Sequence, residues 1–307
     1  MNPITGLLTA LGALTAVFVA GWAKIVMSLR GEPGAASSPA TDAGAPTPLS
    51  TGVGAITNFL DTLGIGSFAT TTALFRFFKM VPDRIIPGTL NVGHTLPTIT
   101  QAFFYVAVIP VDVVTLISMI GAAVAGAWLG AGIVAGWSKH KVQIGMGAAL
   151  LAAAIFFTMR NLGLFPAGSS AIGVSGMLLV VAIAGNFLLG ALMSLGIGLY
   201  APCMILVSLL GMSETTAFPI MMGSCAFLMP VGSLKFIKER AYSLRVALGL
   251  AIGGIPGVIV AVKIVKELDL YKVRWLVIVV VLYTAITMLY AAFSKSPAAG
   301  EAAPERS

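Results

Sequence analysis

Two glycine motifs are the residues of this chain best placed to do chemistry. The first is Leu63-Gly64-Ile65-Gly66-Ser67, and the second, Leu195-Gly196-Ile197-Gly198-Leu199, follows 132 residues later. Glycines at positions i and i+2 weaken a helix, so each motif predicts a break followed by a new helix start. The first amides of a helix have no partner within it and lie at the positive end of its dipole. Each break is therefore a candidate site for a small anion.

Polar residues near the breaks extend this candidate site. Hydroxyl and amide side chains donate hydrogen bonds, and polar groups at membrane depth are costly unless they are partnered or functional. The alternative is that the glycines only allow helices to pack closely. We predict substrate contacts from Gly64, Gly66, Ser67, Thr70, Asn91, His94, Gly196, Gly198, Tyr200, Cys203 and Ser224.

Two ionisable residues near the first break are candidates for coupling to protons. His94 lies on a polar face of the expected helix 86–108, and imidazole titrates near neutral pH. The other polar residues of that face are Asn91, Thr95, Thr98 and Gln101. A structural histidine bonded across helices is the equal alternative. Asp61, just before the break, either carries a proton or pairs with Arg76 or Lys79.

The composition predicts an integral membrane protein. Of 307 residues, 58% are hydrophobic and 9% are charged, whereas a soluble domain carries about a quarter charged residues. The net charge of +7 is spread thinly between apolar runs, so it does not indicate nucleic-acid binding. The two cysteines lack CxxC spacing and there are only two histidines, so the sequence predicts neither a metal site nor a cofactor site. The sequence contains no catalytic motif, so we do not predict an enzyme.

The chain divides into an anchor, a linker and two similar halves. Residues 1–30 predict a transmembrane helix, 31–50 a disordered linker and 296–307 a disordered tail. Residues 51–160 and 171–293 predict two repeats, because several landmarks keep the 132-residue offset, among them Pro87 with Pro219. Each repeat contains a broken segment and three further spans. Whether 171–194 crosses fully or is a half-helix stays open.

Loop charges predict that the two repeats are inverted. Loop 76–84 is basic whereas its counterpart near 211–216 is not, and loop 235–245 is basic whereas its counterpart 109–112 is not. The positive-inside rule then places the basic loops and the C-terminus in the cytoplasm and the N-terminus outside, with loop 263–274 as an exception. The expected fold is an all-α polytopic bundle of two inverted repeats with half-helix hairpins.

These motifs resemble the TauE/SafE family of sulfite and organosulfonate exporters over roughly residues 51–293. The resemblance rests on the two glycine motifs, on Ile86-Pro87-Gly88-Thr89-Leu90 and on Gly223-Ser224. The chain departs from the family where Ser67-Phe68 and Leu199-Tyr200 replace glycines. The resemblance implies a secondary transporter in the cytoplasmic membrane that moves small sulfur-containing anions, with export as the expected direction.

Two other functions remain open at this stage. One is an uptake carrier for a different organic anion, with Phe68 and Tyr200 shaping the site. The other is an accessory membrane protein that transports nothing. The expected partners are a small anion and the lipid bilayer, without nucleic acid and without a cofactor, and the sequence does not define an oligomeric state.

Overall fold

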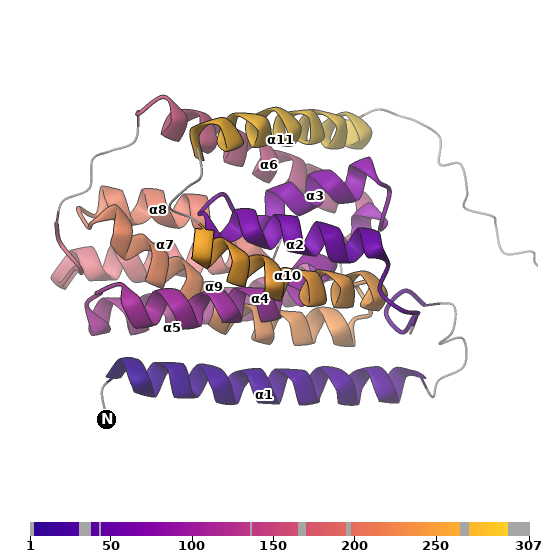
Figure 1. The fold of residues 1–307 in the computed structure, drawn as a ribbon, viewed down its shortest axis with the longest axis horizontal. Helices are drawn as coiled ribbons and strands as arrows, with labels where there is room; N and C mark the ends of the chain where they lie inside the picture. Colours follow the sequence, from indigo (N-terminus) through magenta and orange to yellow (C-terminus); the bar gives the residue numbers. More distant parts are fainter. Residues whose placement is uncertain are drawn as a thin grey trace, which may run out of the picture.

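The computed structural model describes residues 3–30, 38–42, 44–135, 137–164, 170–194, 198–264 and 270–293. Regular structure in these ranges is helical, apart from one isolated β-bridge between Ala171 and Met212 (Figure 1). Five helices are long and apolar enough to cross a membrane. The chain is therefore an all-α, membrane-embedded protein, as its composition predicts.

The helices follow the predicted order of an anchor and two five-helix halves. The first half contains α2 (Pro48–Thr62), α3 (Ser67–Phe77), α4 (Ile86–Val108), α5 (Val113–Ala135) and α6 (Lys139–Asn161), with the short 3-10 helix η2 (Asp83–Ile85) before α4. The second half contains α7 (Gly176–Met193), α8 (Tyr200–Leu209), α9 (Glu214–Lys238), α10 (Leu244–Ile264) and α11 (Leu270–Phe293). Both predicted broken segments are thus divided into two helices each.

The anchor helix α1 (Pro3–Arg30) lies along the outside of the bundle (Figure 1). Its buried residues include Phe18 and Trp22, which pack in a cluster with Phe236 and Tyr242. The indole nitrogen of Trp22 also donates to the hydroxyl of Tyr242 at 3.1 Å. Most of α1 is exposed on the surface of the bundle, so lipid is its expected neighbour.

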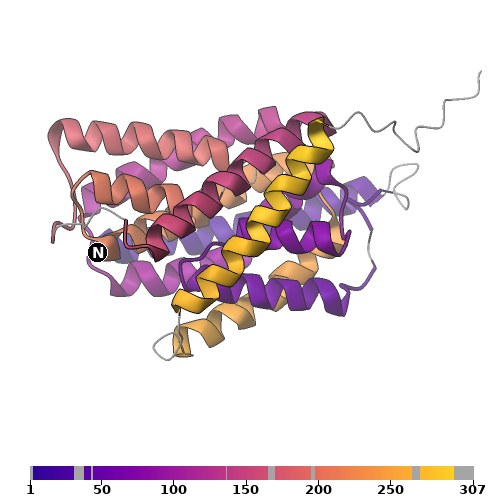
Figure 2. The same ribbon diagram turned by 90° about the horizontal axis from the view of Figure 1, so that it is seen from above.

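Contacts between the two halves come in matched pairs. Three contacts made by the first half have a counterpart made by the second half. Helix α2 packs on α10, and its counterpart α7 packs on α5. Likewise α4 packs on α10 and α9 on α5, and α3 packs on α11 and α8 on α6. Helices α4 and α9 pack on each other, as do α6 and α11, which lie side by side across the bundle (Figure 2). Each half therefore supplies the same set of contacts to the other.

Close glycine contacts define the helix directions. Along α2 and α10, Gly54 lies against Leu250, and further along both helices Ala55 lies against Gly257, so these helices are parallel. Along α5 and α7, Met119 O accepts from Asn186 Nδ2 at 2.7 Å and Ala127 O from Ser194 Oγ at 3.4 Å, which is again a parallel pair.

The pair α4 and α9 is antiparallel. Gly88 at the start of α4 lies near Phe236 at the end of α9, and Val106 at the end of α4 lies near Gly223. Helix α10 is parallel to α4, because Gly93 contacts Ala247 and Pro97 contacts Gly254. Consequently α2, α4 and α10 run in one direction, and α9 runs in the other.

The basic loops 76–84 and 235–245 and the basic segment 137–142 lie at one end of the bundle. Loop 76–84 contacts the start of α6 where Gln143 Nε2 donates to Asp83 Oδ2 at 2.7 Å. The start of α4 contacts the loop before α10 where Ser243 N donates to Thr89 Oγ1 at 3.0 Å. At the opposite end, Asp112 N donates to Ile172 O at 2.9 Å. The positive-inside rule predicts that this end is cytoplasmic, with loop 263–274 as the exception.

Part of the predicted linker has a defined structure. Ala40 and Thr41 are buried, and Pro39 O accepts a hydrogen bond from Leu244 N at 2.9 Å. Thr47 caps α2 by accepting from Ser50 N, so this helix begins at Pro48 rather than after Ser50. Residues 31–37 and 43, together with the tail 296–307, lie outside the described residues.

Asp112 caps the start of α5 at the less basic end. Its Oδ1 accepts from Thr115 N and from Thr115 Oγ1, both at 2.8 Å. These two hydrogen bonds hold the pKa of Asp112 below its ordinary value. The carboxylate therefore stabilises the fold above its unfolded pKa, and this stabilisation is lost as pH falls through the folded pKa.

We expect Asp112→Ala to lower the free energy of unfolding by roughly 0.5 kcal/mol at neutral pH, the low end for losing a cap because solvent screens this site. Unfolding in detergent at neutral and acid pH measures the difference. The gap between wild type and variant should narrow in acid, and a gap that does not change with pH would contradict the prediction.

Candidate functional site

The first break lies between α2 and α3 and depends on two glycines. Gly64 and Gly66 have φ values of 79° and 86°, a region that favours residues without a Cβ atom. They let α3 begin directly beside the end of α2. From there α3 returns along α4, where Thr71 contacts His94, and leads to the start of α4 through η2. The sequence prediction of a break at this motif is confirmed.

The second break lies between α7 and α8. Helix α7 ends at Met193 and α8 begins at Tyr200. The predicted site residue Gly196 lies outside the described residues, whereas Gly198 and Leu199 are described. Leu199 has no polar side chain to cap α8, and Pro202 in the first turn has no amide hydrogen. The first backbone amides of α8 therefore receive no capping hydrogen bond from the side chain of Leu199.

The two breaks meet at one small cavity. Its volume is about 10 Å³, which is room for about one water molecule. The lining residues come from six helices and both breaks: Asp61, Gly66, Ser67, Phe68, Thr98, Met193, Gly198, Leu199, Tyr200 and Cys225. Five predicted residues are thereby brought together, namely Asp61, Gly66, Ser67, Gly198 and Tyr200.

A hydrogen-bonded chain joins the two breaks across this cavity. The amide of Ser67, the first residue of α3, donates to Asp61 Oδ1. Gln101 Nε2 donates to Asp61 Oδ2 at 2.9 Å, and Gln101 Oε1 accepts from the Tyr200 hydroxyl at 2.7 Å. The end of α2 is thus connected through α4 to the start of α8.

His94 lies behind the cavity rather than on it. Asn58 Oδ1 is 3.1 Å from His94 Nδ1, and Thr71 Oγ1 is 2.9 Å from His94 Nε2. An amide oxygen only accepts, so Nδ1 carries the hydrogen and Nε2 accepts from the threonine hydroxyl. The Phe68 ring packs beside the imidazole, with 5.9 Å between ring centroids. Both nitrogens have partners, which is the arrangement of a structural histidine.

Five other predicted residues do not line the cavity. Thr70 donates to Ser67 O within its own helix, and Asn91 Nδ2 donates to Pro87 O at 2.8 Å. Ser224 accepts from Asn186 Nδ2 at 2.9 Å, and Cys203 is buried at the α8 side. Gly64 shapes the break without lining the cavity.

The sequence-based site did not include several residues that line the cavity or belong to its hydrogen-bonded chain. Gln101 and Thr98 had a usable signal, because both belong to the polar face predicted for helix 86–108. Met193 gave none, and Cys225 gave only its alignment with Gly93 at the 132-residue offset, beside the predicted site. Their sulfur atoms lie 3.6 Å apart in the structure, but apolar residues of this kind look like ordinary core in a sequence.

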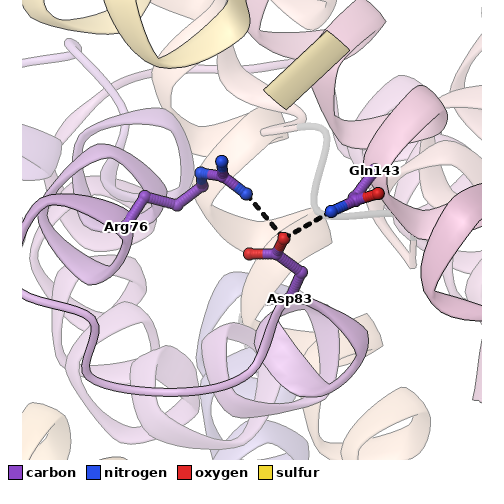
Figure 3. Close-up of polar contacts among 3 residues, drawn as sticks. All are labelled: Arg76, Asp83 and Gln143. Atoms are coloured by element: carbon purple, nitrogen blue, oxygen red, sulfur yellow. Dashed lines mark hydrogen bonds and ion pairs between the residues drawn. The ribbon is translucent and has the colours of Figure 1, made fainter. Parts of the chain in front are cut away.

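The expected ion pair of Asp61 with Arg76 or Lys79 is not made. Arg76 Nη1 instead contacts Asp83 Oδ2 at 2.6 Å, and Gln143 donates to the same oxygen (Figure 3). Asp61 is buried beside the start of α3, whereas Arg76 lies in the last turn of α3, so the two side chains are at opposite ends of this helix and do not meet. Arg76, Lys79 and Arg84 line an open pocket of about 530 Å³ at the basic end.

The described residues contain no group of three or more His, Cys, Asp or Glu side chains placed to hold a metal ion. Comparison with protein-family models, curated proteins and solved structures gave no match. The fold and the site together define a helical membrane protein with a buried polar network between two helix breaks.

Proposed function

We propose that this protein is a secondary transporter of small sulfur-containing anions, such as sulfite or organosulfonates, and that it exports them across the cytoplasmic membrane. The observation that carries the proposal is the meeting of both breaks at one cavity. Gly66 and Gly198, separated by 132 residues in the chain, line the same space. Transporters with paired broken helices bind substrate at such a meeting point.

The helix directions support two inverted repeats. Helix α4 is antiparallel to its counterpart α9, and the matched contacts between halves extend this relation to the other pairs. In an inverted pair, a conformation open to one side has a counterpart open to the other. Both short helices, α3 with 11 residues and α8 with 10, are too short to cross the membrane at ~1.5 Å per residue.

No cationic side chain among the described residues lines the cavity, so in the proposed transporter a small anion is held by backbone amides. Backbone amides at the starts of α3 and α8 supply donors, and the helix dipoles favour negative charge. A cavity of about 10 Å³ holds no more than a water-sized group, so the two breaks must separate to admit an anion. Alternating access by one repeat moving against the other provides this opening.

The pocket at the basic end of the bundle also supports anion transport. Three cationic side chains, Arg76, Lys79 and Arg84, line it together with one acidic residue, Asp83. A concave surface with excess positive charge raises the local concentration of anions. In the proposed topology this pocket is the cytoplasmic mouth, where an exported anion is collected.

A ligand screen on detergent-purified protein tests the proposal. We expect sulfite, thiosulfate or an organosulfonate to raise the unfolding temperature, because a ligand that binds only the folded state stabilises it. The gain is ~2.7 kcal/mol at a hundredfold excess over Kd. Carboxylates and chloride at equal ionic strength are the controls.

The other outcomes favour different functions. A shift with carboxylates alone would favour an uptake carrier for another organic anion. If none of the anions shifts the unfolding temperature, the transporter proposal is wrong and an accessory role becomes the better explanation.

A further inference from the structure

The strongest unexplained feature is a buried carboxylate without a cationic partner. Asp61 is 2% exposed, and it is the one acidic residue among the buried residues that the structure describes. The ion pair in the described part of the chain joins Arg76 to Asp83, not to Asp61. A buried charge of this kind is expensive unless hydrogen bonds or a proton compensate it.

The hydrogen bonds of Asp61 occupy the place where the substrate is expected. Ser67 N, the first amide of α3, donates to Asp61 Oδ1. A carboxylate oxygen and an oxyanion oxygen make the same kind of bond to an amide at a helix start. Asp61 is therefore already in the position that an incoming anion needs, and the cavity of about 10 Å³ leaves no room for both.

Charge repulsion strengthens this competition. Two negative charges in one enclosed site cannot both be ionised without a large cost. The titratable groups that face the cavity from other helices are Tyr200 from α8 and Cys225 from α9. Tyr105 from α4 donates to the adjacent Thr62 O at 2.6 Å, and His94 lies one layer behind, bonded to Asn58 and Thr71. None of these supplies a fixed positive charge to balance a second anion.

The partners of Asp61 also connect its charge to the second break. Gln101 uses its amide nitrogen for Asp61 and its amide oxygen for the Tyr200 hydroxyl. When Asp61 gains a proton, one of its oxygens becomes a hydroxyl that donates, so its bonds with Ser67 N and Gln101 Nε2 cannot both stay as they are. Gln101 Nε2 already reaches Thr62 Oγ1 at 3.1 Å as a second acceptor, and a shift of this amide toward Thr62 moves the oxygen that accepts from Tyr200 at the start of α8.

We propose that the Asp61 carboxylate occupies the anion site at the start of α3 and that protonation of Asp61 opens this site. As a carboxylate it closes the site to anions, and when it takes one proton from the aqueous phase it releases the Ser67 amide to one substrate anion. This inference rests on the proposed transport function. It makes transport a coupled movement of one anion and one proton, with no net charge carried for a monovalent anion.

The test measures proton uptake when methanesulfonate binds, because this probe keeps its charge between about pH 5 and pH 8. Purified wild type is mixed with the probe in weakly buffered detergent solution with a pH indicator, and Kd is measured across the same range. We expect uptake of one proton for each anion and a Kd that tightens about tenfold for each unit of pH decrease above the titration of Asp61. Asp61→Asn should bind without proton uptake and with a Kd independent of pH.

Asp112→Asn is the matched control. Asp112 also accepts from a helix-start amide, but at the end of the bundle and outside the cavity. This variant should take up one proton for each anion, as wild type does. If Asp61→Asn does not fold, the infrared difference spectrum of wild type decides instead. A new protonated-carboxyl band on binding supports the inference, and its absence overturns it.

The failures are distinguishable. If wild type binds methanesulfonate without proton uptake, or Asp61→Asn takes up a proton as wild type does, the inference is wrong while the transporter proposal stands. If no sulfur oxyanion stabilises wild type or Asp61→Asn at any pH, the proposed function is wrong and the inference fails with it.

Discussion

Replacing Gly253 by alanine should prevent the protein from forming a stable bundle. A Cβ atom at this position of α10 would overlap the carbonyl oxygen of Thr51 in α2 and would come within 3.0 Å of Ala55 N. Both atoms belong to the backbone, so no side chain can move aside. Overpacking of a core costs about 1 to 3 kcal/mol even where side chains adjust. We therefore expect a loss of at least about 3 kcal/mol in stability, seen as aggregation or a lower unfolding temperature in detergent.

Gly52→Ala on α2 is the matched control for this prediction. No atom lies within 4 Å of the Cβ that alanine would add there, and alanine favours helix over glycine by roughly 0.5 to 1 kcal/mol. The control should unfold at or above the wild-type temperature. If Gly253→Ala unfolds as the control does, the close parallel contact between α2 and α10 is not present in the folded protein.

The second half allows an independent repeat of this experiment. Gly190 in α7 would overlap the Ala123 carbonyl oxygen in α5 if it gained a Cβ atom, whereas Gly121 in α5 has no atom within 4 Å. The two helix pairs occupy matched positions in the two halves. Equal losses for Gly190→Ala and Gly253→Ala would show that both halves depend on the same packing.

Gly198→Leu should abolish anion transport in proteoliposomes while the protein remains folded and inserted. The Cβ atom at this position meets Phe68 Cβ at 3.7 Å, an ordinary contact, and the rest of the leucine enters the cavity of about 10 Å³. The amides at the start of α8 then become inaccessible to an anion. We expect a loss of at least about tenfold in transport, equivalent to 1.4 kcal/mol of binding.

Gly198→Ala and the unfolding temperature separate blocking from misfolding. Alanine fits within the ordinary contact, so this variant should fold as wild type does and retain part of the transport. Gly66 is less suitable, since its φ of 86° makes any side chain strained by roughly 1 to 2 kcal/mol. Wild-type transport by a folded Gly198→Leu protein would remove the second break from the site.

The sequence by itself determined which class of protein this is and where its helices lie. Apolar runs of 18 or more residues give membrane spans, and glycines at i and i+2 give breaks, because both depend on interactions within one segment. The expected helix 86–108 agrees with α4 at both ends, and both glycine motifs separate two helices. The polar face of α4 was likewise visible from spacing alone, and all five of its residues are buried.

Only the tertiary structure decided which polar groups meet. The sequence left Asp61 between a proton role and an ion pair with Arg76, and helix packing placed it beside Ser67 and Gln101 while Arg76 contacts Asp83. Tyr200 and Gln101 lie 99 residues apart in the chain yet share a hydrogen bond. Contacts of this kind depend on how whole helices pack against one another. Hydropathy and local residue spacing do not encode this packing.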